Sequence, residues 1–378
     1  MAKKKTRHYF DYSLLFAVIF LTAFGLLMIY SSSSYMAEIS SKTNDAAYYM
    51  KRQGVIALCG FVLMAVISMI DYHKLVRLAL PFYFLSYILM IAVSLFGQVV
   101  NGKRRWLGIG PFSFQPTEFA KLALIIFFAV YITNLGKEIN TWKGLFKVIL
   151  LDLPIAFLVG KNNLSSGIII LGLAFVMSFV ATNKQLIYAA ITAAGIGLLT
   201  VIQPVSKFLK DVGILQAYQY NRILVWQNPA AYPQDGGYQI LQGLYAIGSG
   251  GIIGKGLGGS IQKMGFVPEA QNDMIFAIIC EELGLFGAVS IILVFMFMIY
   301  RFIIIANSAP DLYGSLLVIG VMAHVAIQVI LNIAVVTNLI PNTGITLPFI
   351  SYGGTSVLFL MIEMGMVFSV SRSIRMEY

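Results

Sequence analysis

Long apolar stretches separated by short polar ones fill most of this chain. A helix that crosses a membrane needs about 20 mostly apolar residues. Ten stretches approach or reach that length, and each is predicted to form a membrane-spanning helix. They cover residues 11–31, 53–70, 78–95, 116–134, 145–159, 164–181, 185–201, 273–300, 312–336 and 349–371. The pattern therefore predicts an all-α polytopic membrane protein with about ten transmembrane helices.

The composition fits such a protein. Of the 378 residues, 59% are hydrophobic and 11% are charged, and the mean hydropathy is +0.83. A soluble chain carries about 25% charged residues, which excludes a large soluble core. The two cysteines, Cys59 and Cys280, lie inside apolar stretches and provide neither a disulfide framework nor a metal site. The chain is therefore predicted to form one integral-membrane domain, residues 1–378.

The basic residues predict the orientation and the kind of partner. The net charge is +10, and the basic residues gather at helix ends and in loops, which favours an anionic membrane surface or lipid over nucleic acid. Basic residues flank both ends of the chain: Lys3, Lys4, Lys5, Arg7, Arg372 and Arg375. Because cytoplasmic segments carry the excess of basic residues, both tails, 1–10 and 372–378, are predicted to be cytoplasmic. The segment 203–272, between the seventh and eighth helices, is then a large extracytoplasmic loop.

This predicted loop is rich in glycine and too long for a plain connection. Residues 238–247 show roughly helical spacing, and we expect an interfacial helix there. The glycine-rich runs 248–251 and 254–256 then allow sharp turns. A glycine-rich loop can hold phosphate, but this one follows no strand and is no Walker motif. A flexible re-entrant turn is the stronger interpretation.

A second predicted outer loop, between the third and fourth helices, carries Lys103, Arg104, Arg105 and Trp106. Basic residues are unusual in a short loop on this face of a membrane protein. Two interpretations stay open. The residues anchor lipid headgroups, or they form a site for an anionic group such as a phosphate. Trp106 also fits the aromatic belt that is typical of the membrane interface.

The end of the long loop holds the main candidates for chemistry. Asp273 stands at the mouth of an apolar stretch, with Glu269 just before it, and carboxylates beside membrane helices are usually functional. Asp273 is either the N-cap of the eighth helix or a general base or metal ligand at the outer surface. Arg222 and Gln239 are weaker candidates for ligand contact. Ser351 either helps to cap the last helix or faces a ligand.

Other charged residues lie inside the apolar stretches. Glu281 and Glu282 are either a buried pair satisfied by neighbouring helices or part of a proton relay. Glu118 and Lys121 are three residues apart and share a helix face, which predicts a salt bridge. The alternative is that Lys121 turns toward an acid such as Asp273 or Glu281.

Five motifs together resemble those of the SEDS family, the FtsW/RodA/SpoVE proteins of bacterial cell-wall synthesis. They occur in family order, and the resemblance covers essentially the whole chain. They are KRRW at 103–106, FSFQPTEFAK at 112–121, GGYQILQGLYAIGSGGIIGKGLGG at 236–259, PEAQNDMIFAIICEELG at 268–284 and PNTGITLPFISYGGTS at 341–356. The last motif, preceded by VVTNLI, is more similar to the FtsW/SpoVE branch than to RodA.

The resemblance implies the ten-helix SEDS fold and a peptidoglycan glycosyltransferase. Such an enzyme polymerises lipid II into glycan strands at the outer face of the cytoplasmic membrane. Its partner is a class B penicillin-binding protein, and the FtsW-like motif implies a place at the division septum with other division proteins. The family's essential acid falls on Asp273. Its basic and Trp motif falls on Arg105 and Trp106, and its Glu and Lys pair on Glu118 and Lys121.

Some positions depart from the family pattern, although Asp273 does not. Gln271 and Asn272 replace the usual His and Thr, Thr117 replaces a Ser, and residues 162–165 lack the Pro-Asp pair of many members. A divalent cation, Mg²⁺ or Mn²⁺, would suit a leaving pyrophosphate. The sequence shows no ligand cluster for one, so no metal ligand is assigned.

Two other functions stay open at this level. A lipid II flippase would use the same basic loop and intramembrane charges without covalent chemistry. It would spread those charges across the midplane, whereas a polymerase gathers them at one face. A scaffold for division proteins would tolerate replacement of Asp273.

Overall fold

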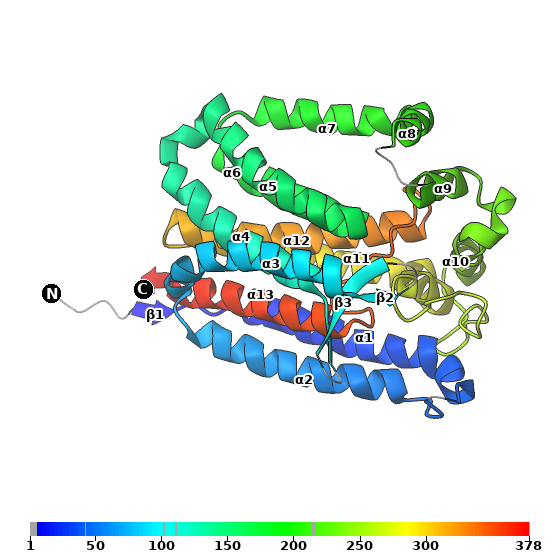
Figure 1. The fold of residues 1–378 in the computed structure, drawn as a ribbon. Helices are drawn as coiled ribbons and strands as arrows, with labels where there is room; N and C mark the ends of the chain where they lie inside the picture. The colour runs from blue at the N-terminus through cyan, green and yellow to red at the C-terminus, as the bar shows by residue number, and fades with distance from the viewer. Residues whose placement is uncertain (1–5, 42, 101–102, 110–111, 214–216, 378) are drawn as a thin grey trace.

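Each of the ten apolar stretches forms a helix. The computed structural model describes residues 6–41, 43–100, 103–109, 112–213 and 217–377, so Lys3, Lys4 and Lys5 lie outside the described residues. Ten helices match the stretches, and in Figure 1 most of them run roughly from left to right, with α5 and α6 sloping across the view and α7 apart at the top. They are α1 (Tyr12–Ile39), α2 (Tyr48–Met69), α3 (Ala79–Phe96), α4 (Pro116–Leu135), α5 (Trp142–Asn162), α6 (Leu164–Ala181), α7 (Gln185–Thr200), α11 (Ile275–Ser308), α12 (Leu312–Val336) and α13 (Gly354–Ser373).

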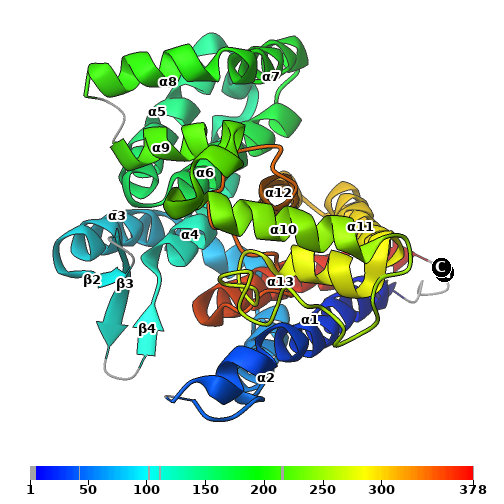
Figure 2. The ribbon, with the colours of Figure 1, turned by 90° about the vertical axis from the view of Figure 1, so that its right-hand side faces the viewer.

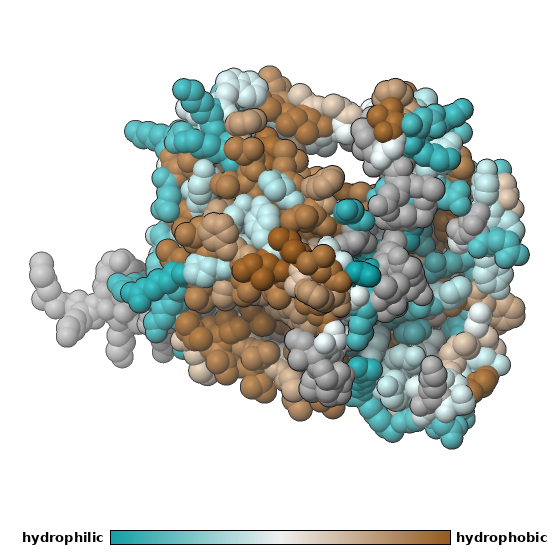
Figure 3. Space-filling view, viewed as in Figure 1, coloured by the Kyte–Doolittle hydropathy of each residue, from teal (hydrophilic) through white to brown (hydrophobic). Residues whose placement is uncertain are grey.

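The surface has the banding of a membrane protein. In the view of Figure 3, a broad hydrophobic zone lies between two hydrophilic ends. Within the described ranges, eight helices are long and apolar enough to cross a membrane. The two others of the ten are α5, which carries several charged residues, and α7, which has only 16 residues. The expected count of ten crossings therefore stays a prediction.

Besides the predicted helices, the described residues form two small antiparallel sheets, which the sequence pattern did not predict. Strands β2 (Gln98–Val100), β3 (Lys103–Ile109) and β4 (Phe112–Phe114) form one sheet between α3 and α4. Strand β1 (Thr6–His8) pairs with β5 (Arg375–Glu377), with Arg7 opposite Met376. The two ends of the chain therefore lie together, at the left of Figure 1.

The long segment between α7 and α11 lies at the opposite end of the molecule from the termini (Figures 1 and 2). It contains α8 (Ile202–Asp211), α9 (Ala217–Gln227) and α10 (Gly237–Gly250). The helix expected at 238–247 is α10, and it packs across α11. Four short 3-10 helices complete the connections: η1 (Tyr72–Leu78), η2 (Gly136–Asn140), η3 (Pro229–Ala231) and η4 (Pro233–Asp235).

Several helix boundaries differ from those predicted; α1, for example, continues to Ile39 instead of ending at 31, and α2 begins at Tyr48 instead of 53. Two of the differences bear on the site. The eighth predicted helix, 273–300, is α11, which begins at Ile275, continues to Ser308 and is broken at Gly284 (φ 66°). The tenth, 349–371, is α13, which begins only at Gly354. The residues before it form an irregular turn in which Phe349 has φ 62°, so the apolar character of this stretch was not a sign of helix.

Candidate active site

Asp273 lies in the turn immediately before α11, but it does not cap that helix. The N-cap position is Met274, and no side chain makes a capping hydrogen bond. Asp273 is half-buried, and its Oδ1 atom is fully buried without a hydrogen-bond partner in the described structure. Its main-chain oxygen accepts a hydrogen bond of 2.9 Å from Asn332 Nδ2 on α12. The backbone of Asp273 is therefore fixed by Asn332, whereas its carboxylate takes no part in capping the helix. The N-cap interpretation is wrong.

Charged residues from three other parts of the chain act on this carboxylate. Burial raises the pKa of Asp273, the carboxylate of Glu269 raises it further, and the guanidinium groups of Arg222 and Arg105 lower it, with a resulting pKa of about 7. A carboxyl group with this pKa exchanges its proton readily near neutral pH, as a general base must. The structure therefore brings together four of the residues predicted for the site.

A chain of hydrogen bonds holds Arg222, whose charge acts on Asp273. Arg222 on α9 donates from Nη1 to the main-chain oxygen of Asn342 at 2.8 Å. Asn342 donates from Nδ2 to Gln239 Oε1 on α10 at 3.1 Å, and Gln239 donates from Nε2 to the oxygen of Pro268 at 3.3 Å. Gln239 thus serves as a link between segments. Asn342 and Asn332 were not predicted, although each is a polar residue in or beside an apolar stretch.

The basic residues of the loop between α3 and α4 have different roles. Arg104 donates from Nη1 to the oxygens of Ser94 and Leu95, at 3.1 and 2.8 Å, and so satisfies the end of α3. Arg105 is the residue that acts on Asp273. Trp106 is half-buried on β3, opposite Gln98. The backbone of Lys103 is in β3, but its side chain lies outside the described part of the structure.

Glu118 and Lys121 form the salt bridge that their spacing predicts. Lys121 Nζ lies 2.9 Å from Glu118 Oε1, and both side chains are buried in α4. Lys121 is therefore committed to its neighbour rather than to Asp273. A second buried pair, which the sequence reasoning missed, joins α12 to α13: His324 Nδ1 lies 2.7 Å from Glu363 Oε2. Both residues stand out as polar positions within apolar stretches.

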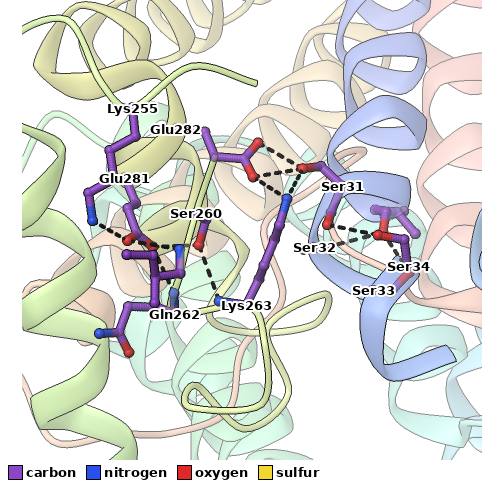
Figure 4. A network of polar contacts seen from close by, with 12 residues as sticks. Ser31, Ser32, Ser33, Ser34, Lys255, Ser260, Gln262, Lys263, Glu281 and Glu282 are labelled. Carbon is purple, nitrogen blue, oxygen red and sulfur yellow. Dashed lines mark hydrogen bonds and ion pairs between the residues drawn. The ribbon is translucent and has the colours of Figure 1, made fainter. Parts of the chain in front are cut away.

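Glu281 and Glu282 are satisfied by the long loop rather than by neighbouring transmembrane helices alone. Glu281 accepts a 2.7 Å bond from Lys255 Nζ, and Glu282 accepts a 2.8 Å bond from Lys263 Nζ (Figure 4). The two adjacent side chains take different partners because neighbours on a helix point about 100° apart. The pair is therefore buried and satisfied, but its lysine partners come from the loop, and Ser31 of α1 is the helical residue that binds Glu282.

Ser351 is buried in the turn before α13. Its hydroxyl oxygen accepts a 2.7 Å hydrogen bond from the backbone N–H of Leu347. The next residue, Tyr352, donates from its backbone to the oxygen of Gln271, two residues from Asp273, at 2.9 Å. Ser351 therefore shapes the turn that supports the site, and its expected contact with substrate stays a prediction.

The described part of the chain contains no cluster of residues that would bind a metal ion. Within the described ranges, no group of three or more His, Cys, Asp or Glu residues could hold a metal ion. The arrangement offers one acid with a pKa of about 7 within the electrostatic influence of two arginines. Such a site can remove a proton from one group and offset negative charge on another.

These features define a polytopic helical membrane protein with a titratable acid at the end of the molecule opposite its termini. The chain belongs to the FtsW/RodA/SpoVE family, since the family model, described as cell cycle protein, matches residues 12–376. Its SEDS fold is that of RodA.

Curated relatives match along nearly the whole chain. The stage V sporulation protein E of Bacillus subtilis (strain 168) is 39% identical to this chain, and the match covers 98% of this chain and 99% of that relative's length. A protein of Trichlorobacter lovleyi named probable peptidoglycan glycosyltransferase FtsW is 35% identical, over 97% of this chain and 94% of its own.

Solved structures agree in fold. One, described as "Structural coordination of polymerization and crosslinking by a peptidoglycan synthase complex", matches with a TM-score of 0.77 and 26% identity over 96% of this chain and 98% of that chain. The rod shape determining protein RodA of Thermus thermophilus matches with a TM-score of 0.68 and 25% identity, over 97% of each chain.

Proposed function

We propose that this protein is a peptidoglycan glycosyltransferase that polymerises lipid II into glycan strands at the outer face of the cytoplasmic membrane. The observation that carries the proposal is Asp273, a partly buried acid with a pKa of about 7 on which the charges of Arg222 and Arg105 act. Relatives of similar length that are named probable peptidoglycan glycosyltransferase FtsW support it.

In the proposed reaction, Asp273 takes the proton from the acceptor sugar's hydroxyl group. The hydroxyl oxygen then forms a bond to the anomeric carbon of the donor, and the bond from that carbon to the lipid pyrophosphate breaks. Direct displacement inverts the anomeric centre, so an α-linked donor gives a β-linked strand. Arg105 and Arg222 offset the charge on the leaving pyrophosphate. Lys121 was also considered for this task, but its charge is already paired with the buried carboxylate of Glu118. Arg104, which was considered too, binds main-chain oxygens at the end of α3.

A solved structure supports a partner, and the arrangement of the chain supports an orientation. The structural neighbour from a peptidoglycan synthase complex supports a class B penicillin-binding protein as the partner of this chain. We further propose that both termini are cytoplasmic, since they lie at the end opposite Asp273, and that the enzyme works at the division septum with other division proteins. Synthesis at the septum rests on the FtsW names of relatives.

A lipid II flippase is the second candidate. It is favoured by the buried charged residues of the bundle, the Glu118–Lys121 and His324–Glu363 pairs. Glu281 and Glu282 favour it less than the sequence suggested, because both bind lysines of the loop rather than lining a path.

The deciding experiment is polymerisation of purified lipid II by the detergent-solubilised protein with its penicillin-binding partner. Wild type is expected to form strands, and Asp273→Asn, which keeps the size of the side chain, is expected to form none while unfolding at the same temperature. Equal strands from both proteins would remove Asp273 as the base. No strands from either, with lipid II moved across vesicles, would favour the flippase. Addition of EDTA in the same assay tests whether Mg²⁺ or Mn²⁺ is needed.

A further inference from the structure

Three segments of the chain, the long loop, α11 and the distant α1, meet at Glu282. Lys263 Nζ lies 2.8 Å from Glu282 Oε1, and it also donates to Ser31 Oγ on α1 at 3.0 Å. Ser31 Oγ in turn lies 2.7 and 2.8 Å from the two carboxylate oxygens of Glu282. Figure 4 shows the three side chains pointing toward one another from the loop, α11 and α1. We call this triad the Lys263 pin.

The loop is fixed to α11 at a second place, where the helix breaks. The backbone N–H groups of Leu285 and Phe286 donate to Gly251 and Ile252, at 2.9 and 3.1 Å. On the other side of the break, Lys255 N–H donates to the oxygen of Glu281 at 3.0 Å. The turn thus replaces the helical hydrogen bonds that Gly284 interrupts. Together with the ion pair between Lys255 and Glu281, it fixes the first part of the loop.

The pin holds the part of the loop that leads to Asp273. After Lys263, the chain turns back through a 2.9 Å bond from Val267 N–H to the oxygen of Gln262, and Val267 and Ala270 are buried. At its far end, Asp273 is held by Asn332. The segment 264–272 therefore lies between the Lys263 pin and Asn332. Two hydrogen bonds also hold its second half, from Gln239 Nε2 to the oxygen of Pro268 and from Tyr352 N–H to the oxygen of Gln271, so the pin is the anchor of its first half.

Stability alone is a poor explanation for the pin. Glu282 is completely buried and Lys263 is 6% exposed, and desolvating two such charges largely cancels their attraction. An apolar pair of similar size would pack at least as well. Buried ion pairs can instead select one arrangement among several, because only one geometry satisfies both charges.

We propose that Lys263, Glu282 and Ser31 are positioning residues, which fix the segment 264–272 so that Asp273 is presented to substrate in its partly buried setting. The proposal rests on the proposed glycosyltransferase function for its effect on rate. Its structural part, the ordering of segment 264–272 by the pin, does not depend on that function.

The test removes the pin without leaving a buried charge unpaired. The double variant Lys263→Met with Glu282→Met replaces both charges by unbranched apolar side chains and is expected to fold. In the proposed polymerisation assay, we expect kcat/KM to fall about 10- to 100-fold, as for other misplaced catalytic groups. The acid limb of the pH profile should also move from about pH 7 toward lower pH, because a loosened Asp273 gains water. Ser31→Ala, which keeps the ion pair, should change both quantities less.

A second measurement does not require activity. Hydrogen–deuterium exchange of residues 264–272 should be faster in the double variant than in wild type. The matched control is Lys51→Met, which breaks the exposed ion pair of Lys51 with Asp45 and should leave both the exchange of 264–272 and the pH profile unchanged.

The outcomes separate the two proposals. Wild type that makes no strands overturns the glycosyltransferase, while the exchange experiment still tests the pin. Unchanged exchange in the double variant overturns the pin, as do wild-type kcat/KM and a wild-type acid limb. A lower yield of active protein alone would reduce the rate without moving the acid limb, so a general loss of folding cannot imitate the expected result.

Discussion

The pKa of Asp273 predicts a pH dependence with a definite sign. A general base works only as the free carboxylate, so activity should rise with pH through about 7. At pH 6 about one-tenth of the molecules would carry the carboxylate, against about nine-tenths at pH 8. An ordinary aspartate, with a pKa of about 3.9, would be ionised at both values, and its profile would be flat. The expected difference between pH 6 and pH 8 is therefore close to tenfold in kcat/KM.

The neighbours of Asp273 provide variants with opposite effects. Glu269→Gln removes a negative charge that raises the pKa, so the acid limb should move to lower pH. Arg222→Gln removes a positive charge that lowers the pKa, so the limb should move to higher pH. The assay is the initial rate of lipid II polymerisation at low substrate concentration between about pH 5.5 and 8.5, since kcat/KM reports the free enzyme. A flat wild-type profile, or shifts of the same sign in both variants, would refute the reasoning.

Three further predictions concern the scaffold, and thermal unfolding in detergent measures each. Lys121→Met leaves the buried charge of Glu118 unpaired and should cost about 3–5 kcal/mol, while adding Glu118→Gln should restore much of the loss; equal unfolding temperatures for the single and double variants would contradict this. Gly254→Ala should destabilise more than Gly256→Ala. Both glycines have positive φ, so alanine is strained at either position. An added Cβ would also lie 2.3 Å from the backbone oxygen of Glu282 at Gly254, whereas at Gly256 it would meet open space. Equal decreases in the unfolding temperature would show that the turn does not pack tightly against α11. Ser351→Ala should cost about 1 kcal/mol with KM almost unchanged, whereas a large rise in KM would indicate contact with substrate.

Local patterns in the sequence predicted the elements well. Each apolar stretch became a helix because a backbone in an apolar environment must satisfy its own hydrogen bonds. The spacing of Glu118 and Lys121 predicted their salt bridge, since residues three apart share a helix face. The resemblance of the motifs placed the chain in its family. The predicted start at 349 failed because apolar residues there form an irregular turn, and apolar character alone does not distinguish a turn from a helix. The helices α1 and α11 end eight residues later than predicted, at Ile39 and Ser308.

Only the tertiary structure decided which charges meet. Ser31 and Glu282 are 251 residues apart in sequence, and Arg222 reaches Asn342 across 120 residues. No local spacing predicts such pairs, because they depend on how the loop returns across α10, α11 and α1. The surroundings of Asp273 were also decided by the tertiary structure. The sequence identified it as a candidate, but its half-buried setting and its charged neighbours arise from packing, which sets the cost of ionisation and hence its pKa.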